Sequence, residues 1–149
     1  MIVLYLRPGS WNLPLYLHVL GATVLFGGTF ALTVLAFAAW RGRESAAMLA
    51  RLAFWTLLVV VLPAWILMRA GAQWIVDKEF PGNTPGWVDV GFVVSEPGLV
   101  LILVLGIVAW LSARRGGTGR LAAALALLAP VYLAALAVAW FAMSAKPGA

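Results

Sequence analysis

Residues 13–40 read LPLYLHVLGATVLFGGTFALTVLAFAAW, an apolar run with no acidic or basic residue except the single histidine of the chain, His18. Such a run is long enough to cross a bilayer as a tilted helix. The whole chain is 64% hydrophobic and 10% charged, whereas ordinary soluble domains are roughly 45–50% apolar and 25% charged. A soluble fold of 149 residues could not bury so much apolar surface, so the sequence predicts an integral membrane protein.

Three further apolar runs, 52–76, 88–113 and 121–143, complete the predicted set of four helices. The third must begin near Trp87 or Val90, because the uninterrupted part after Pro97 is shorter than the roughly 20 residues that a span needs. Residues 77–87 hold two Pro-Gly pairs and form a turn-rich loop. We therefore expect an all-α, polytopic membrane protein, with residues 1–149 as one domain folded into a four-transmembrane-helix bundle.

The basic residues predict how this bundle is oriented. Cytoplasmic loops carry an excess of Lys and Arg, which indicates a multi-pass protein of the plasma or inner membrane with both termini and loop 77–87 on the extracytoplasmic side. No basic stretch is long enough to indicate nucleic-acid binding. The predicted cytoplasmic connections carry Arg41, Arg43, Arg51, Arg114, Arg115 and Arg120 against Glu44, and the opposite side carries Arg7, Arg69, Lys78 and Lys146 against Asp77, Glu79, Asp89 and Glu96.

Small residues at four-residue steps predict where the helices pack, because they let backbones approach closely within lipid. On the first helix these are Thr23, Gly27 and Ala31, and on the fourth they are Ala122, Ala126, Pro130 and Ala134. Gly21 of the first helix is a further candidate packing residue.

Three predicted helices each bring a polar side chain to a similar depth. Counted at 1.5 Å per residue, His18 lies roughly 8 Å, and Arg69 and Glu96 roughly 10 Å, from the extracytoplasmic helix ends. Gln73 and Trp65 share the face of Arg69. One hypothesis is an Arg69–Glu96 ion pair, capped by Gln73 and His18, that fixes helix register.

The other hypothesis is an outward-facing binding pocket, with Trp65 as part of its wall. A neutral imidazole can ligate haem iron or copper, and a guanidinium suits an anionic group. A single histidine excludes bis-histidine haem ligation within one chain, so Met68 and Met143 are the candidate partner ligands of His18. Haem b and copper both stay open as cofactors.

The segment 17–22, Leu-His-Val-Leu-Gly-Ala, followed by Gly27 and Gly28, resembles a family of small predicted integral membrane proteins of unknown function that begin with Leu-His-x-x-Gly-Ala. More distantly, the histidine and the following glycines are similar to CopD-type copper-resistance domains and to HemJ-type protoporphyrinogen oxidases, which bind haem b. That resemblance implies a cofactor role for His18. Thr33, Val34 and Leu35 stand where the HemJ pattern has an arginine, which argues against porphyrinogen oxidation.

The sequence therefore predicts a non-catalytic accessory or cofactor-binding component of the membrane, with an outward-facing polar site. Two alternatives stay open: a haem- or copper-linked redox protein, and a small transporter, which would need an oligomer to form its path. The expected partners are the lipid bilayer and either other membrane subunits or further copies of the chain.

Overall fold

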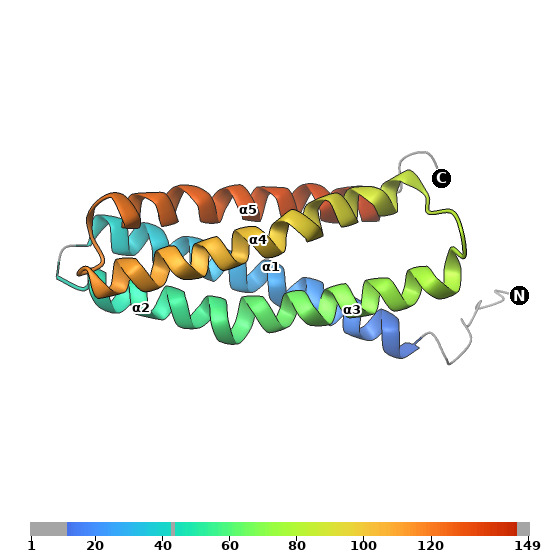
Figure 1. Cartoon of the computed structure of the whole chain (residues 1–149), viewed down its shortest axis with the longest axis horizontal. Coiled ribbons are helices and arrows are strands. Elements are labelled where there is room, and N and C mark those ends of the chain that lie inside the picture. Colours follow the sequence, from blue (N-terminus) through green and yellow to red (C-terminus); the bar gives the residue numbers. More distant parts are fainter. Residues whose placement is uncertain (1–11, 43, 146–149) are drawn as a thin grey trace, which may run out of the picture.

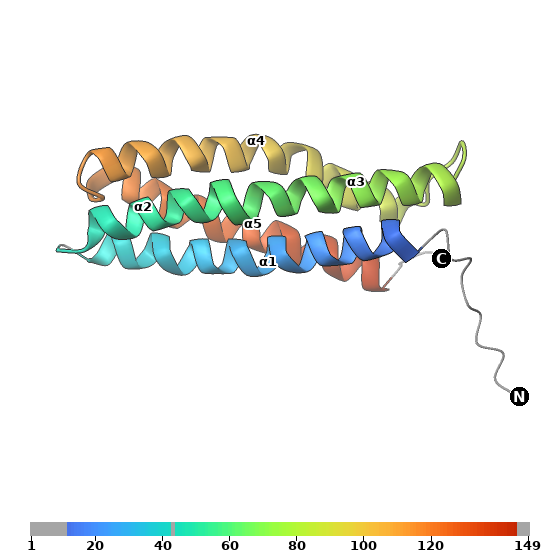
Figure 2. The ribbon, with the colours of Figure 1, turned by 90° about the horizontal axis from the view of Figure 1, so that it is seen from below.

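The computed structural model describes residues 12–42 and 44–145, and within them it forms four long helices that lie side by side (Figures 1 and 2). The first is α1 (Asn12–Arg41). The second is continuous through α2 (Ala46–Thr56), the π-helical turn η2 (Leu57–Val61) and α3 (Leu62–Glu79), and it is followed by α4 (Gly86–Arg114) and α5 (Gly119–Ala145). All four are long and apolar enough to cross a membrane. The predicted all-α, four-transmembrane-helix bundle is confirmed, and only residues 80–85 of the predicted loop lie outside helices.

The helices form a four-cornered bundle in which α1 packs against α2, α3 and α5, and α4 packs against α2 and α5. One end, which we call the His18 end, carries the first turns of α1 and α4 and the last turns of α3 and α5. The other, the arginine-turn end, carries Arg41, Arg114 and Arg120 on its helix termini. Arg7, Arg43 and Lys146, which entered the predicted orientation, lie outside the described residues.

The second helix changes its hydrogen-bond pattern just before Pro63. The backbone N–H of Leu62 bonds to the carbonyl of Leu57, five residues back, which is the π-helical pattern. Proline has no N–H and its ring crowds the carbonyl four residues earlier, so an unbroken α-helix cannot pass through this position without loss. The π turn relieves that conflict and lets α2 and α3 continue as one span.

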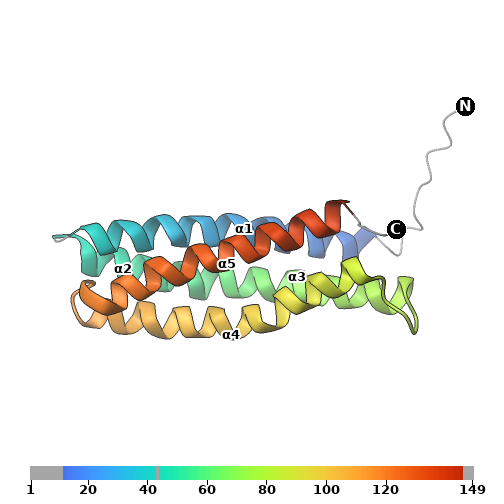
Figure 3. The same ribbon diagram turned by 90° about the horizontal axis from the view of Figure 1, so that it is seen from above.

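Pro97 bends α4, because its ring crowds the carbonyl four residues earlier and it has no N–H to donate. Figure 3 shows the bend in the half of the helix near the His18 end. Beyond the bend α4 leaves the neighbourhood of α3, with which it makes few contacts, although it packs closely on α2 in the other half of the bundle. The bundle is therefore tight at the arginine-turn end and open between α3 and α4 at the His18 end.

The packing face of α1 differs in part from the predicted one, since Gly21 is buried but the other three predicted residues are not. Thr23, Gly27 and Ala31 are exposed on the outside of the bundle, and no described residue of another helix lies within 4 Å of a Cβ built on Gly27. The prediction that this seam packs within the bundle is wrong, because small residues on this helix lie on two faces and only the other face is buried. On α5 Ala122 and Ala126 are buried as predicted, while Ala134 is exposed. The buried face of α1 consists of Pro14, Gly21, Leu25, Gly28, Thr29, Leu32, Ala36 and Ala39.

Two glycines set the crossing of α1 and α3. A Cβ on Gly21 would lie 2.7 Å from Met68 Cα, and a Cβ on Gly71 would lie 2.5 Å from the backbone nitrogen of His18. Each glycine thus meets the backbone of the other helix, which is the close approach that small residues permit in membrane bundles. The crossing places His18 directly beside Met68.

Candidate functional site

Two adjoining cavities occupy the His18 end of the bundle. The first, of about 230 Å³, lies between α1, α4 and α5, and the second, of about 500 Å³, lies between α3 and α4. The second is in the size range of small-molecule sites, about 300–1,000 Å³. Five residues from all four helices line both cavities: His18, Met68, Gly91, Ser95 and Met143. We call these five residues the junction.

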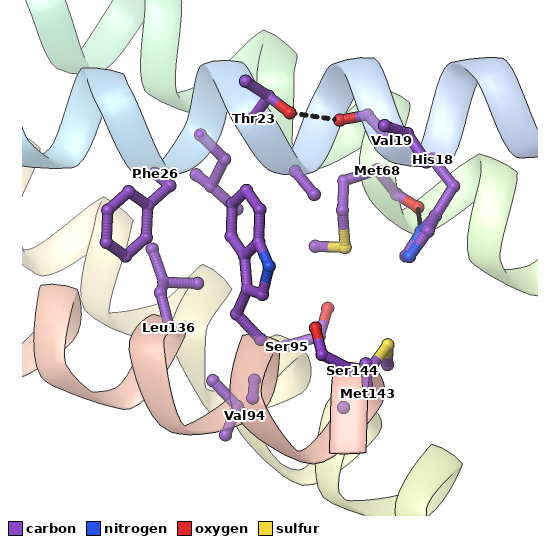
Figure 4. A pocket seen from close by; sticks show the side chains of 15 residues that line it. His18, Val19, Thr23, Phe26, Met68, Val94, Ser95, Leu136, Met143 and Ser144 are labelled. Carbon is purple, nitrogen blue, oxygen red and sulfur yellow. Dashed lines mark hydrogen bonds between the residues drawn. The ribbon is translucent and has the colours of Figure 1, made fainter. Parts of the chain in front are cut away.

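The junction holds the imidazole of His18 in one orientation. Its Nδ1 lies 3.1 Å from the carbonyl oxygen of Met68, across the crossing made by Gly21 and Gly71 (Figure 4). A carbonyl can only accept, so Nδ1 carries the proton and donates it. In the neutral ring, Nε2 is then left with its lone pair, ready to accept a hydrogen bond or to ligate a metal. Backbone carbonyls commonly fix ligating histidines in this way.

The two methionines predicted as ligand candidates both reach the junction. Met68 extends from α3 and Met143 from α5, and Figure 4 shows both side chains on the same side of α1 as the His18 ring. The terminal methyl group of Met143 lies against Gly91 of α4, where any side chain would collide with it. The bend in α4 and the absence of a side chain at Gly91 therefore make room for the Met143 thioether.

Ser95 adds a buried hydroxyl without a partner. Its residue is 6% exposed, and its Oγ has no hydrogen bond to any other described residue. Serine and threonine inside helices usually bond to the carbonyl four residues back, as Thr29 does with Leu25. A buried polar group left unpaired is costly, so each one calls for an explanation. Here the hydroxyl belongs to a residue that lines both cavities.

The predicted ion pair is present on the α3–α4 side of the second cavity. Arg69 Nε donates to Glu96 Oε1 at 2.8 Å, and its Nη1 donates to Gln73 Oε1 at 2.9 Å. Its guanidinium also lies over the Phe92 ring, 4.7 Å from the centroid. His18 takes no part in this pair, contrary to the structural hypothesis, because its Nδ1 bonds to the Met68 carbonyl. Arg69 therefore ties α3 to α4 where the helices have separated.

The structure thus divides the predicted site residues into two groups. His18, Met68, Met143 and Arg69 all line the second cavity. Glu96 and Gln73 are exposed and line neither cavity.

Trp65 also lines neither cavity, contrary to the prediction that it forms a pocket wall. Its indole N–H donates to the carbonyl oxygen of Ser95 at 3.0 Å. The indole thus bonds to the backbone of α4 and supports the helix that carries the junction serine.

Sequence reasoning missed Ser95, Gly91 and Gly71. The nearest available signal was the Ser95-Glu96-Pro97 segment, because a proline inside a membrane helix frees a carbonyl and bends the backbone next to it. Nothing in the local sequence shows that the Ser95 hydroxyl lacks a partner.

The residues at the junction fit only some metal centres. An imidazole nitrogen with one or two thioethers is a donor set for a soft ion such as Cu(I), or for haem iron with His–Met ligation. Within residues 12–42 and 44–145 there is no group of three or more His, Cys, Asp and Glu side chains that could hold a metal ion. A metal at this site would therefore depend on His18, Met68 and Met143.

Comparisons of the chain with protein-family models, with curated proteins and with solved structures find no match.

Proposed function

We propose that the chain is a ligand-binding component of a membrane, an accessory or cofactor-binding protein whose ligand occupies the junction. One observation supports this most directly: the Met68 carbonyl holds Nδ1 of the only histidine, whose side chain lines two adjoining cavities and whose Nε2 bonds to none of the described residues. A polar, ionisable side chain is costly within a membrane helix and is retained where it contacts a partner or a ligand.

The direction of the site follows from the arginines. Arg41, Arg51, Arg114, Arg115 and Arg120 lie at the arginine-turn end with Glu44, while Asp77, Glu79, Asp89 and Glu96 lie at the His18 end with Arg69 and Lys78. By the positive-inside rule the His18 end is extracytoplasmic. The second cavity then opens near the outer surface of a plasma or inner membrane, and a ligand reaches it from that side or from the outer leaflet.

The two thioethers favour a second candidate, a metal-linked redox component of the haem- or copper-binding kind. Met68 and Met143 come from different helices to the same junction as His18. Thioether ligands stabilise the softer, reduced state of copper and raise the potential of haem iron. An absorption spectrum and a metal analysis of the purified protein separate this candidate from an organic ligand.

The test uses a variant that fills the site. Ala22 lines the first cavity, whereas Ala31 of the same helix is exposed on the outside of the bundle. We expect wild-type protein and Ala31→Phe, extracted gently from the membrane of expression, to carry the same bound species in stoichiometric amount. Ala22→Phe should lack it. The proposal is overturned if no species is bound, or if all three proteins carry the same species in equal amount.

A further inference from the structure

We infer that the ligand of the junction is an amphipathic molecule with a neutral, hydroxyl-bearing head and a single apolar tail. The head hydroxyl donates to His18 Nε2 and accepts from the Ser95 hydroxyl, and the tail fills the first cavity. This inference rests on the proposed function and names the class of ligand.

The two cavities differ in lining along the bundle. Arg69 and Glu79 line the second cavity, which lies toward the helix ends, and no Asp, Glu, Lys or Arg is among the described residues that line the first. The first cavity follows α1 from His18 to Phe26, a rise of about 12 Å toward the middle of the bundle. Its deeper walls are Leu25, Phe26 and Leu136. A molecule that fits both environments is polar at one end and apolar at the other.

The junction is matched to a hydroxyl group. His18 Nε2 accepts and does not donate when the ring is neutral, because Nδ1 already carries the proton for the Met68 carbonyl. The Ser95 hydroxyl has no partner among the described residues and can donate. A ligand hydroxyl supplies both missing partners at once: its hydrogen to Nε2 and its oxygen to Ser95. Pairing the buried Ser95 hydroxyl and the part-buried His18 Nε2 at once is what would give the site its selectivity.

The charges nearby argue for a neutral head. Among the residues that the structure describes, Arg69 is the one arginine or lysine that lines either cavity. Its guanidinium already donates to Glu96 and Gln73 and lies over Phe92. An anionic head at the junction would have to compete with the Glu96 carboxylate for that cation.

The volume and the methionines favour an organic ligand over a bare ion. Cavities of about 230 and 500 Å³ are far larger than one metal ion requires. Methionine side chains are flexible and polarizable, and they adapt to irregular apolar surfaces. Met68 and Met143, where the two cavities meet, would therefore pack around the first segment of the tail.

The first cavity is reached from lipid. Val19 and Thr23 of α1 and Trp140 of α5 line it and are exposed on the outside of the bundle. The rings of Phe26 and Trp140 meet edge to face, 5.5 Å apart between centroids, at the deeper limit of this opening. A molecule dissolved in the bilayer can thus enter between α1 and α5, tail and head together, without passing through water.

The experiment uses a long-chain primary alcohol with a photoactivatable diazirine on its chain, and the methyl ether of the same alcohol as control. Both probes are added to protein in phosphatidylcholine vesicles, and the labelled positions are mapped by mass spectrometry. We expect the alcohol to label the walls of the first cavity about tenfold more than the ether, because the ether cannot donate to Nε2. In His18→Leu the alcohol should fall to the level of the ether.

Three further variants complete the design. Ser95→Ala removes the hydroxyl that donates to the oxygen of either probe, so labelling by both probes should fall. This variant tests the inference if His18→Leu does not fold. Ala22→Phe should block both probes, and Ala31→Phe should block neither.

The inference is overturned if wild-type protein does not distinguish alcohol from ether, if His18→Leu keeps the distinction, or if stoichiometric haem or copper excludes the probes. If the inference fails in one of these ways but Ala22→Phe blocks labelling or removes the haem or copper, the proposed function stands. If the probes label the cavity walls as strongly in Ala22→Phe as in wild-type protein, both the inference and the proposed function are contradicted.

Discussion

The imidazole of His18 and the carbonyl of Met68 meet at 3.1 Å because α1 and α3 cross at two glycines. Gly21 faces the backbone of Met68, and Gly71 faces the backbone of His18. The hydrogen bond that orients the histidine therefore depends on a backbone contact one turn away on either helix. A side chain at either glycine would separate the helices and release the ring.

We expect Gly71→Ala to destabilise the protein, because its Cβ would lie 2.5 Å from the His18 nitrogen. Overpacking of this kind typically costs about 1–3 kcal/mol. The free energy of unfolding, measured by chemical denaturation in detergent micelles, gives the value. Gly27→Ala is the matched control, since nothing lies within 4 Å of its added Cβ. Its free energy of unfolding should not fall, and equal losses in the two variants would contradict this account of the crossing.

The Arg69–Glu96 pair should show a modest coupling energy. Its side chains are 24% and 57% exposed, and pairs so accessible contribute roughly 0.2–1 kcal/mol. A double-mutant cycle with Arg69→Met and Glu96→Gln measures this coupling energy. The same cycle with Glu79→Gln should give no coupling, because Glu79 lies ten residues along α3, about 15 Å from Arg69. A coupling to Glu96 that is indistinguishable from zero would mean that the pair does not tie α3 to α4.

Tyr132 is buried at the centre of the bundle, with its ring against Gly98 and its hydroxyl without a partner among the described residues. Tyr132→Phe removes that hydroxyl and keeps the ring. We expect the free energy of unfolding to stay the same or to rise by up to about 2 kcal/mol. Tyr132→Ala should instead lower it by about 3–5 kcal/mol, because it leaves a large cavity. A clear loss of stability in Tyr132→Phe would show that the hydroxyl is satisfied, for example by buried water.

The Trp65 indole supports α4 through its bond to the Ser95 carbonyl. Trp65→Phe keeps an aromatic ring but loses the donor, and we expect a loss of about 0.5–1.5 kcal/mol in the free energy of unfolding. Trp55→Phe is a suitable control, since Trp55 is 51% exposed and near the other end of the same span. If both variants lose the same free energy, the Trp65 hydrogen bond makes no specific contribution.

The four helices could be predicted because each apolar run matches the thickness of a bilayer, which is a simple physical constraint. The inward face of each helix could not be predicted in the same way. Lipid and protein interior are both apolar, so Thr23, Gly27 and Ala31 looked like a packing seam although they lie outside the bundle. In a soluble helix the water-facing side would have been polar and the error would have been visible.

The Arg69–Glu96 part of the candidate site could be predicted, because the depth of a residue along its helix can be counted from the sequence. His18, Arg69 and Glu96 share a depth, and Arg69 and Glu96 do form an ion pair. The junction was not predictable as a whole, because it depends on the bend at Pro97 and on the separation of α4 from α3. Ser95 becomes informative only when its hydroxyl is seen to lack a partner.

Nitrogen-15 NMR of protein labelled at its single histidine tests the central claim most directly, because both ring nitrogens then belong to His18. In the neutral ring we expect the proton to be on Nδ1, which donates it to the Met68 carbonyl, and the lone pair to be on Nε2. Adding the long-chain alcohol should shift the Nε2 signal and leave Nδ1 protonated, while the methyl ether should not shift Nε2. An unprotonated Nδ1, or an Nε2 signal that no ligand changes, would contradict the proposal that His18 is the centre of a binding site.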